Sequence, residues 1–395
     1  MIKRKKQKQN NNPFYDSTLK ARHNKASIFK NLTLASLIFS IVFLGFFLFD
    51  IIGKGIPAFK IAYVQVNVTI DEKSLDDTRF AVAKEHREIV SRAWLRDIPA
   101  LIKEKPELMN TTTAMWVLAD DQVDQYLKGN NHKLKDKDIT IVEKFKEEGL
   151  ITTKFNAILF TNGDSKTPEY AGLYSAIIGS ILTLIITMAV AFPIGVMTAI
   201  YLEEFAGDNK FTRFIEININ NLAAIPAILF GLLGLAIYIN LFGLPRSSPL
   251  VGGLTLALMT LPIIIVSSRA ALRAVPDSIR QAGYGLGLNK IQVTRDHVLP
   301  LAFPGILTGS ILGLAHAMGE TAPLIIIGMI AFIPDAPGSI TQAATVMPAQ
   351  LFTWAGMPEG MYIEKTAAGI VVLLTILISL NTVAIILRKK FEVKW

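Results

Sequence analysis

The chain has 395 residues, of which 51% are hydrophobic and only 18% are charged, and its mean hydropathy is +0.42. This balance excludes an ordinary soluble protein and indicates a membrane protein. The formal net charge of +8 is compatible with a nucleic-acid binder until the basic residues are located along the chain. The absence of cysteine excludes disulfide scaffolds, thiolate metal sites and cysteine nucleophiles.

Six stretches are apolar over the roughly 20 residues that a helix needs to cross a hydrocarbon core. Only two of the chain's 72 charged residues fall inside them, Asp50 near the end of the first stretch and Glu320 in the fifth. The remainder of the chain is as charged as a soluble protein. We therefore predict six transmembrane helices, at 32–52, 173–202, 222–242, 250–267, 305–332 and 367–387.

Lys and Arg are concentrated in alternate connections between these spans. The first 31 residues hold nine of them, whereas the loops 243–249 and 333–366 hold one each. Because basic residues accumulate on the cytoplasmic side, this bias predicts that both termini face the cytoplasm. The positive charge then marks topology and contact with lipid headgroups, not nucleic acid. We also predict that the span at 32–52 is a retained anchor, since no signal-peptide cleavage site follows it directly.

Residues 53–172 form a long extracytoplasmic segment with 18 basic and 19 acidic residues. The alternation from Ile61 to Val68 predicts a strand, and a 3.6-residue period from Phe80 to Ile102 predicts a helix. Residues Leu150 to Phe160 predict a second strand. We therefore expect a small α+β domain between the first two spans.

The sequence lacks the motifs of a nucleotide hydrolase or a membrane protease. No Gly-x4-Gly-Lys-Ser/Thr, Gly-x-Ser-x-Gly or His-Glu-x-x-His occurs. The two histidines of the 53–172 segment, His86 and His132, have no partner at metal-ligand spacing and are expected at the surface. We expect no catalytic residue, metal or cofactor on this chain, so any ATP that it uses must be bound by a partner.

The most specific signal lies in the basic loop 269–304. There Gln281-Ala282-Gly283 is followed after three residues by Gly287, and after nine more residues by His297-Val298-Leu299-Pro300. This spacing predicts two short helices joined by a close-packed turn, with Gly287 free of a Cβ and Pro300 at the start of a new element. By composition alone, a surface helical hairpin explains the loop equally well.

This spacing resembles the Glu-Ala-Ala-x3-Gly-x9-Ile-x-Leu-Pro loop of ABC importer permeases. In that family the loop is the coupling helix, which fits a cleft on the ATPase subunit and transmits its closure to the membrane. The matching positions are Ala282, Gly287, Leu299 and Pro300. The chain differs at Gln281, Gly283 and His297, which stand where the family has Glu, Ala and a branched apolar residue.

Two further segments narrow the resemblance. Residues 225–235, Ile-Pro-Ala-Ile-Leu-Phe-Gly-Leu-Leu-Gly-Leu, and 319–324, Gly-Glu-Thr-Ala-Pro-Leu, resemble the phosphate permease subunits of these importers, the PstA family. The similarity runs from about Tyr170 to the C-terminus, and the N-terminal part resembles the longer members with an extra extracytoplasmic domain. The predicted parts are a basic cytoplasmic tail (1–31), the anchor (32–52), the α+β domain (53–172), a MetI-like permease core of five helices (173–387) and a cytoplasmic tail (388–395).

The resemblance implies one membrane subunit of an ATP-driven importer that moves inorganic phosphate inward by alternating access. Its partners would be a second permease (PstC-like), an ATPase dimer (PstB-like) that carries ATP and Mg, and an extracytoplasmic phosphate-binding protein (PstS-like), in a prokaryotic inner (plasma) membrane. Two alternatives stay open: a permease for another oxyanion, and a receptor or scaffold whose outer domain senses a ligand. The absence of a signalling domain after the last span disfavours the receptor.

The fifth span carries the candidate substrate path. A carboxylate in mid-bilayer costs about 2.5 to 3.5 kcal/mol on insertion scales, so Glu320 is expected to face a cavity or a partner. His316 lies four residues earlier on the same helix face. Thr321 adds a hydroxyl, and Pro323 is expected to free a carbonyl within the span. His316 and Glu320 could contact phosphate, or they could only pair with each other to hold helices together.

Two prolines and three asparagines in or next to the spans are expected to shape the helices and not to bind a ligand. Pro193 and Pro226 are expected to kink their helices and, as hinges, are candidates for a gate. Asn218, Asn220 and Asn221 cluster at the cytoplasmic entrance of the third span and are expected to be caps, not a binding site.

Overall fold

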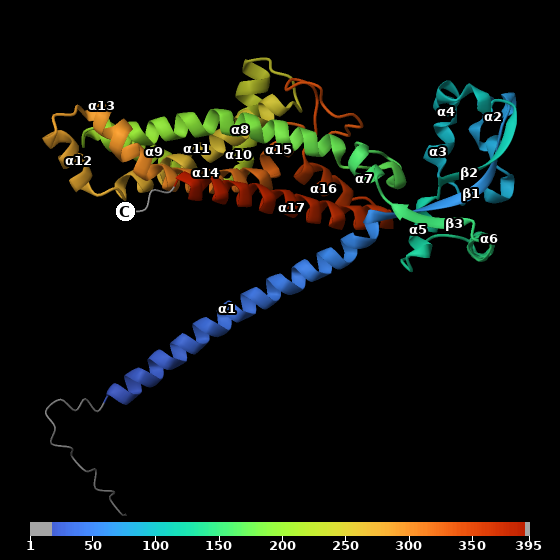
Figure 1. Cartoon of the computed structure of the whole chain (residues 1–395), viewed down its shortest axis with the longest axis horizontal. Helices are drawn as coiled ribbons and strands as arrows, with labels where there is room; N and C mark the ends of the chain where they lie inside the picture. The colour runs from blue at the N-terminus through green and yellow to red at the C-terminus, as the bar shows by residue number, and fades with distance from the viewer. Residues whose placement is uncertain (1–17, 392–395) are drawn as a thin grey trace, which may run out of the picture. The chain divides into compact units, whose positions relative to one another are not determined.

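The computed structural model describes residues 18–391 and forms two compact units, residues 1–53 and 54–395 (Figure 1). Within its described part, the first unit consists of a single helix, α1 (Leu19–Gly55), whose apolar side chains are exposed along its length. The helix contains the predicted anchor but begins earlier, so the second half of the predicted basic tail is helical. The predicted tails otherwise lie outside the described residues at 1–17 and 392–395.

The second unit begins with a domain built on a three-stranded antiparallel sheet in the order β2-β1-β3. The central strand β1 (Lys60–Ile70) pairs with β2 (Thr111–Leu118) and β3 (Ile151–Phe155). We call residues 60–172 the sheet domain. The predicted α+β domain and its first strand are confirmed, whereas β2 was not predicted. The strand expected at 150–160 ends at Phe155 and is followed by a helical turn, α7 (Ile158–Thr161).

The sheet domain has one covered face because the sequence of β1 alternates. Alternate residues from Val64 to Ile70 are almost fully buried, whereas the residues between them are partly or fully exposed. Successive side chains of a strand point to opposite faces, so the buried set shares one face. Helices α5 (Asp121–Leu127) and α6 (Asp136–Glu147) supply Val123 and Phe145 to the same core.

The single helix predicted from Phe80 to Ile102 is wrong. Val82 forms an isolated antiparallel bridge with Val68, and Val90 forms another with Ala119. These backbone pairings hold the two valines in extended conformation, so tertiary pairing overrides the apolar period of the segment. The region folds instead as α2 (Glu72–Asp76), 3-10 turns at Thr78–Ala81 and Lys84–His86, α3 (Arg92–Arg96), α4 (Ile98–Glu104) and a 3-10 turn at Pro106–Leu108.

His86 and His132 are not the surface residues that the sequence predicted. Both are half-buried. His86 packs edge-on against Phe145 and His132 against Tyr126, each with ring centroids 4.9 Å apart. The apolar body of the imidazole ring explains this placement, because it contributes to the core of the domain in the same way as other aromatic rings.

Four long helices form the bundle that follows: α8 (Tyr174–Ile200), α11 (Pro249–Arg273), α14 (Leu299–Gly319) and α17 (Gly360–Phe391). The most buried of them, α11, packs against both α8 and α14. A Cβ on Gly253 of α11 would meet Ile186 of α8 at 2.6 Å, and one on Gly309 of α14 would overlap Ser267 of α11. Small residues thus allow the close helix contacts that are typical of membrane bundles.

The predicted span at 222–242 is a bent pair of helices and not one straight crossing. The chain bends by 103° between α9 (Lys210–Ala223) and α10 (Ala227–Gly234), which continues as a π-helical stretch, Leu235–Leu241. Pro226 stands at the break, where its ring and missing N–H prevent a continuous helix. In the part of the chain that the structure describes, five helices are long and apolar enough to cross a membrane, or six if this pair is one broken span.

The predicted span at 305–332 is interrupted at Glu320. α14 ends one residue earlier, Glu320 adopts an extended conformation, and a short helix, α15 (Ala322–Ile326), follows. Gly328 then takes a φ of +96°, a left-handed conformation that favours glycine and ends the helix. From there the chain runs without a helix to α16 (Met347–Ala355). The apolar composition that predicted one span therefore belongs to a broken element.

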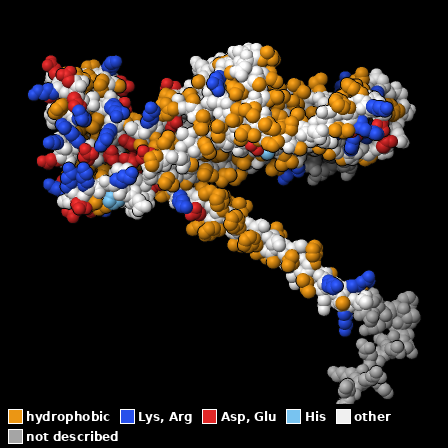
Figure 2. Space-filling model, turned by 180° about the vertical axis from the view of Figure 1, so that it is seen from behind, with side chains coloured by type: hydrophobic (Ala, Val, Ile, Leu, Met, Phe, Trp, Pro, Cys, Tyr) orange, Lys and Arg blue, Asp and Glu red, His pale blue; other side chains and the backbone are white. Residues whose placement is uncertain are grey.

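Within the second unit, the sheet domain and the connection between α11 and α14 lie at opposite ends of the bundle (Figure 1). Charged side chains gather at both ends, and apolar side chains dominate the surface between them (Figure 2). This is the distribution expected of a bundle that crosses a membrane, with the sheet domain on one side and the α11–α14 connection on the other.

Candidate coupling segment and substrate path

The two short helices predicted between α11 and α14 are present. They are α12 (Asp277–Gly285) and α13 (Lys290–Val293), and we call residues 277–293 the coupling segment. Asn289 begins α13 with a capping box, because its side chain accepts from the amide of Gln292 and the Gln292 side chain accepts from the amide of Asn289, both at 2.9 Å. A π-helical stretch, Thr294–Val298, then leads into α14.

Gly283 and Gly287 shape the coupling segment for different physical reasons. Gly283 is buried, and a Cβ there would come within 2.8 Å of Val293 Cγ2, so it is the position of close packing. Gly287 has open space around it but a φ of +81°, which a residue with a Cβ adopts only at a cost. The turn therefore needs glycine at position 287 because its backbone angle disfavours a Cβ, and not because a neighbouring group lies close to it.

The coupling segment exposes three apolar side chains at or next to its tip, residues 281–287. Leu286 is 79% exposed, Ile291 63% and Tyr284 45%. Gln281 and Ala282 are exposed on the same short helix. Exposed apolar groups that cluster on a polar segment are typical of a surface that contacts another protein. Sequence reasoning missed the three apolar residues, although their occurrence inside a basic loop was a usable signal.

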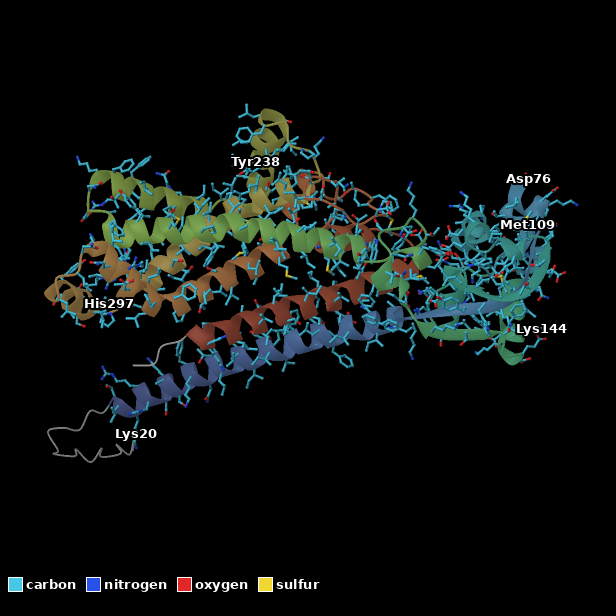
Figure 3. The ribbon with its side chains drawn as sticks, turned by 45° about the horizontal axis from the view of Figure 1, so that its top comes forward. Lys20, Asp76, Met109, Lys144, Tyr238 and His297 are labelled. Carbon is cyan, nitrogen blue, oxygen red and sulfur yellow. The ribbon has the colours of Figure 1, made fainter. Side chains whose placement is uncertain are left out.

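The other predicted coupling residues lie at the start of α14 and away from the tip. His297 and Leu299 are half-buried, and Pro300 occupies the first turn of α14, as its missing N–H predicts. Figure 3 shows His297 at the end of the bundle opposite to Met109 and Lys144 of the sheet domain. The predicted set is therefore divided between a tip, residues 281–287, and a connection to α14.

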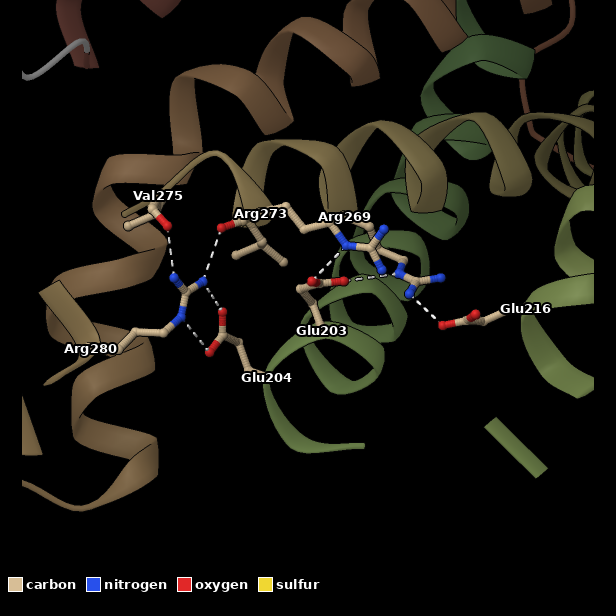
Figure 4. A network of polar contacts seen from close by, with 8 residues as sticks. Glu203, Glu204, Glu216, Arg269, Arg273, Val275 and Arg280 are labelled. Carbon is tan, nitrogen blue, oxygen red and sulfur yellow. Dashed lines mark hydrogen bonds and ion pairs between the residues drawn. The ribbon is translucent and has the colours of Figure 1, made fainter. Parts of the chain in front are cut away.

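Arg280 anchors α12 to the ends of two bundle helices (Figure 4). Its guanidinium donates to both carboxylate oxygens of Glu204, in the π-helical stretch Tyr201–Phe205 that continues α8, with Nη2–Oε1 at 2.6 Å and Nε–Oε2 at 3.3 Å. It also donates to the carbonyls of Leu272 and Val275, at 3.0 and 2.8 Å. The hydrogen bond to Glu204 raises the pKa of Arg280 above its ordinary value. Arg280 therefore joins the coupling segment to α8 and α11 at one point.

A second group of ion pairs lies beside this anchor (Figure 4). Glu203 accepts from Arg269 Nε at 3.3 Å and from Arg273 Nε at 2.7 Å. Arg269 also donates to Glu216 of α9 at 2.5 Å. These contacts tie α8, α9 and α11 together at the same end of the bundle. No local pattern predicted them, because each pair is more than 50 residues apart in the chain.

His316 and Glu320 are brought together, as their spacing predicted. Nε2 of His316 and Oε1 of Glu320 lie 3.4 Å apart where α14 ends. Their side chains are 49% and 25% exposed, so the pair lies at the surface of this chain and not in an enclosed cavity. An ionisable pair that faced lipid at this depth would be costly. The pair is therefore expected to face a partner subunit or a water-filled path.

Pro323 and Gly231 form a close contact between α15 and α10. A Cβ on Gly231 would come within 2.7 Å of Pro323 Cα. Pro323 is buried in the first turn of α15, where its missing N–H removes no helical hydrogen bond, so it does not free a carbonyl as predicted. Thr321 precedes this turn and is half-buried. The segments 225–235 and 319–324, which were singled out separately in the sequence, thus pack on each other.

The two candidate hinge prolines differ in their surroundings. Pro226 stands at the bend between α9 and α10, whereas Pro193 lies inside α8, which stays one continuous helix. Asn218 donates to the carbonyl of Phe214 within α9, at 2.7 Å, so it does not cap a helix end. Asn220 and Asn221 are exposed on the same helix.

Buried polar contacts hold the sheet domain on the start of α17. Lys365 is 1% exposed, and its Nζ donates to the carbonyls of Pro168 at 2.6 Å and Ala171 at 2.7 Å. Its neighbour Glu364 accepts from Lys128 at 3.0 Å. A buried ammonium group is tolerated only where its donors are matched, so these contacts define one geometry. Three further hydrogen bonds join the sheet domain to the bundle. Tyr362 of α17 donates to the carbonyl of Ser165, and two side chains of α16 also donate, Trp354 to Asp164 and Gln350 to the carbonyl of Gly172.

A protein-family comparison covers the part of the chain that contains these features. The family model described as "Binding-protein-dependent transport system inner membrane component" matches residues 191–394, more than half of the chain. The chain belongs to this family. It is therefore a multi-pass membrane component of a transport system. A second family model, "Domain of unknown function (DUF3333)", matches residues 16–88 and 78–136.

Curated relatives of this chain include phosphate permeases. It is 37% identical over 160 residues to the phosphate transport system permease protein PstA of Mycobacterium leprae (strain TN), covering 40% of this chain and 52% of that protein. The chain thus spans about half the length of that relative. It is 31% identical over 223 residues to PstA of Yersinia pestis, covering 55% of this chain and 73% of that protein. A probable ABC transporter permease of Bacillus subtilis (strain 168), YqgH, is 30% identical over 215 residues, covering 52% of this chain and 69% of that protein.

Among solved structures, the permease is similar to a chain of the MetNI methionine ABC transporter in an inward-facing conformation. The TM-score is 0.45 and the identity 16%, over 56% of this chain and 98% of that chain.

Proposed function

We propose that this chain is the permease subunit of an ATP-driven importer for inorganic phosphate. The observation that carries the proposal is the family match over residues 191–394 together with 31% identity to a phosphate permease across 73% of that protein. The matched region includes the coupling segment and the 319–324 block. The chain itself is a non-catalytic subunit, with ATP and Mg²⁺ held by a separate ATPase dimer.

The coupling segment is the proposed docking site for that ATPase. Its exposed apolar tip at Leu286 supports this role, as does its position at the end of the bundle opposite to the sheet domain. Closure of the ATPase dimer would move α12, and the bond from Arg280 to Glu204 would pass the movement into α8. The coupling segment and both termini then lie on the cytoplasmic side of a prokaryotic inner membrane, and the sheet domain on the outer side.

The substrate path is proposed to run past His316 and Glu320. Their exposure on this chain supports a path at the interface with a second permease subunit, which covers the pair. Protonated His316 can donate to a phosphate oxygen, and Glu320 can accept from a protonated one. A binding protein would deliver phosphate on the side of the sheet domain. As α14 and α15 rock with the coupling segment, access to the pair alternates between the two sides.

The deciding experiment is uptake into vesicles that contain the assembled transporter. We expect ATP-dependent accumulation of labelled phosphate in preference to sulfate or molybdate. Glu320→Gln should lower the rate about tenfold, the effect of losing one charge-assisted hydrogen bond. Asp335→Asn, which removes an exposed carboxylate outside the 319–324 block, should leave the rate unchanged.

The other results are equally informative. Preference for a different oxyanion would reassign the substrate, and accumulation that did not require ATP would overturn the importer. An unchanged rate in Glu320→Gln would leave His316 and Glu320 with only a structural role.

A further inference from the structure

The sheet domain contains a cleft of about 700 Å³ with an unusual share of the domain's positive charge. Of the 18 basic and 19 acidic residues between 53 and 172, six basic side chains but only two acidic ones line it. The basic residues are Arg79, Lys84, Arg87, Arg92, Arg96 and Lys137. A nearly neutral domain has therefore gathered a third of its cations around one concave surface.

Two of these cations are neutralised within the cleft. Arg79 forms a two-pronged contact with Asp77, at 2.7 and 2.9 Å, and Arg92 pairs with Glu88 at 3.2 Å. The hydrogen bonds from Arg79 lower the pKa of Asp77 to about 2, so this carboxylate stays ionised. Among the described residues, no carboxylate pairs with the other four cations, which are Lys84, Arg87, Arg96 and Lys137.

Arg87 is held in place for binding an anion. Its Nε donates to the carbonyl of Val82 at 3.2 Å, and its guanidinium carbon lies 5.0 Å from the centre of the Phe80 ring. These contacts fix the plane of the guanidinium and use only one of its three nitrogens. In the part of the chain that the structure describes, no acceptor is bound to the other two. A fixed guanidinium fork of this kind matches the oxygens of a phosphate group and loses little entropy on binding.

The size and charge of the cleft define the ligand class. Its volume lies within the range of ordinary small-molecule sites and exceeds what one orthophosphate ion fills. Four uncompensated cations around such a volume fit a compact ligand with high charge density. A short condensed phosphate carries about one charge on every tetrahedral unit, whereas a peptide with the same charge is far bulkier.

We propose that this cleft binds a multiply charged phosphate anion of the condensed-phosphate class. The ligand comes from solution, since Asp76, next in sequence to the cleft residue Asp77, lies at the end of the sheet domain away from the helix bundle (Figure 3). On the other side of Glu88 and Arg92 the charge reverses, in a cleft of about 410 Å³ that contains Asp120, Asp121 and Glu169. This reversal confines anion binding to the basic side. The site is separate from the proposed transport path, so either can exist without the other.

The test is calorimetric titration of the purified full chain in lipid nanodiscs, without partners, with tripolyphosphate, orthophosphate and hexaglutamate. We expect tripolyphosphate to bind, with an affinity that falls as salt is added. Orthophosphate should bind at least about tenfold more weakly because it forms fewer charge-assisted hydrogen bonds, and hexaglutamate should also bind at least about tenfold more weakly because it is too bulky to bring its charges together in the cleft. Arg87→Gln should weaken tripolyphosphate binding about tenfold. Lys137→Gln, at an exposed position that does not support the fold, should weaken it about threefold.

The matched control is Lys144→Gln, which removes the same charge from an exposed position outside the cleft. It should leave the affinity unchanged. The proposal is overturned if tripolyphosphate does not bind, if Lys144→Gln weakens binding as much as Lys137→Gln, or if hexaglutamate binds as tightly, which would indicate an acidic protein segment as the ligand. None of these outcomes depends on uptake, so the proposal and the importer function stand or fall separately.

Discussion

Arg280 and Glu204 lie 76 residues apart in the sequence, yet their side chains form two hydrogen bonds that join the coupling segment to the end of α8. Glu204 is buried, and the remaining donors of Arg280 reach carbonyls at the end of α11. A displacement of α12 therefore enters the bundle through this pair.

We expect Arg280→Gln to detach α12 from the bundle. Removing one partner of a largely buried ion pair leaves the other charge without compensation, which costs about 3 kcal/mol. Hydrogen exchange of residues 277–285 should accelerate, and phosphate uptake should fall although the protein inserts normally. The control is Arg295→Gln, which breaks an exposed pair with Asp296 and should change little. Equal protection of α12 in both variants would contradict the anchor.

Gly287→Ala should loosen the turn of the coupling segment, whereas Gly285→Ala should not. A Cβ has open space at both positions, but only Gly287 has a positive φ. Alanine at +81° costs about 1 to 2 kcal/mol, while alanine within helix α12 is favourable by up to about 1 kcal/mol. Affinity of the purified chain for the proposed ATPase partner should thus fall in Gly287→Ala alone. Identical behaviour of the two variants would show that the backbone angle is unimportant.

The stability of the sheet domain should fall as the pH rises from about 4 to about 8. Burial and the neighbouring Asp121 raise the pKa of Asp120 from 3.8 to about 8. In this window the folded domain holds a proton that the unfolded chain has released, so folding weakens with increasing pH. Asp120→Asn keeps an oxygen that can cap the amide of Gln122 and should flatten this dependence in thermal unfolding.

Asp77 should give the opposite pH dependence of stability in the same thermal unfolding measurement. Its pKa is lowered by Arg79, so its contribution to stability is present above pH 4 and is lost as the pH falls toward about 2. Asp77→Asn should therefore remove stability at neutral pH and leave the dependence between pH 4 and 8 intact. If Asp120→Asn kept the wild-type slope, another group would be responsible for it.

Lys365→Met should loosen the sheet domain from α17. The substitution keeps much of the side-chain volume but leaves the carbonyls of Pro168 and Ala171 without their donor. Unpaired buried polar groups cost about 1 to 3 kcal/mol each. Limited proteolysis between residues 156 and 173 should become faster. The control is Lys389→Met, at an exposed position near the other end of the same helix. This variant should be cleaved by the protease at the wild-type rate.

Much of the architecture follows from local patterns. The alternation of β1 and the long apolar runs of α8, α11 and α17 predicted elements close to their observed positions. Glycine and proline spacing also predicted the helical hairpin of the coupling segment. Each of these signals depends on residues that are neighbours along the chain.

The broken spans show where such patterns stop being informative. Hydropathy over 222–242 and 305–332 predicted two continuous helices, because it records composition and not backbone direction. The breaks place Gly231 against Pro323, a contact between residues 92 positions apart that no window of sequence contains. The position of Glu320 at a helix end, with His316 beside it, depends on that arrangement.

The sequence by itself determined that this is a membrane protein with an added α+β domain, because composition, charge bias and periodicity are properties of local chain segments. The resemblance of its motifs to a known family then indicated a permease. Only the tertiary structure decided which charges meet. Arg280 binds Glu204, Lys365 donates to the carbonyls of Pro168 and Ala171, and six cations of the sheet domain line one cleft. The reason is physical: the groups that offset the cost of burying Arg280 and Lys365 come from distant parts of the chain, and only folding brings them close.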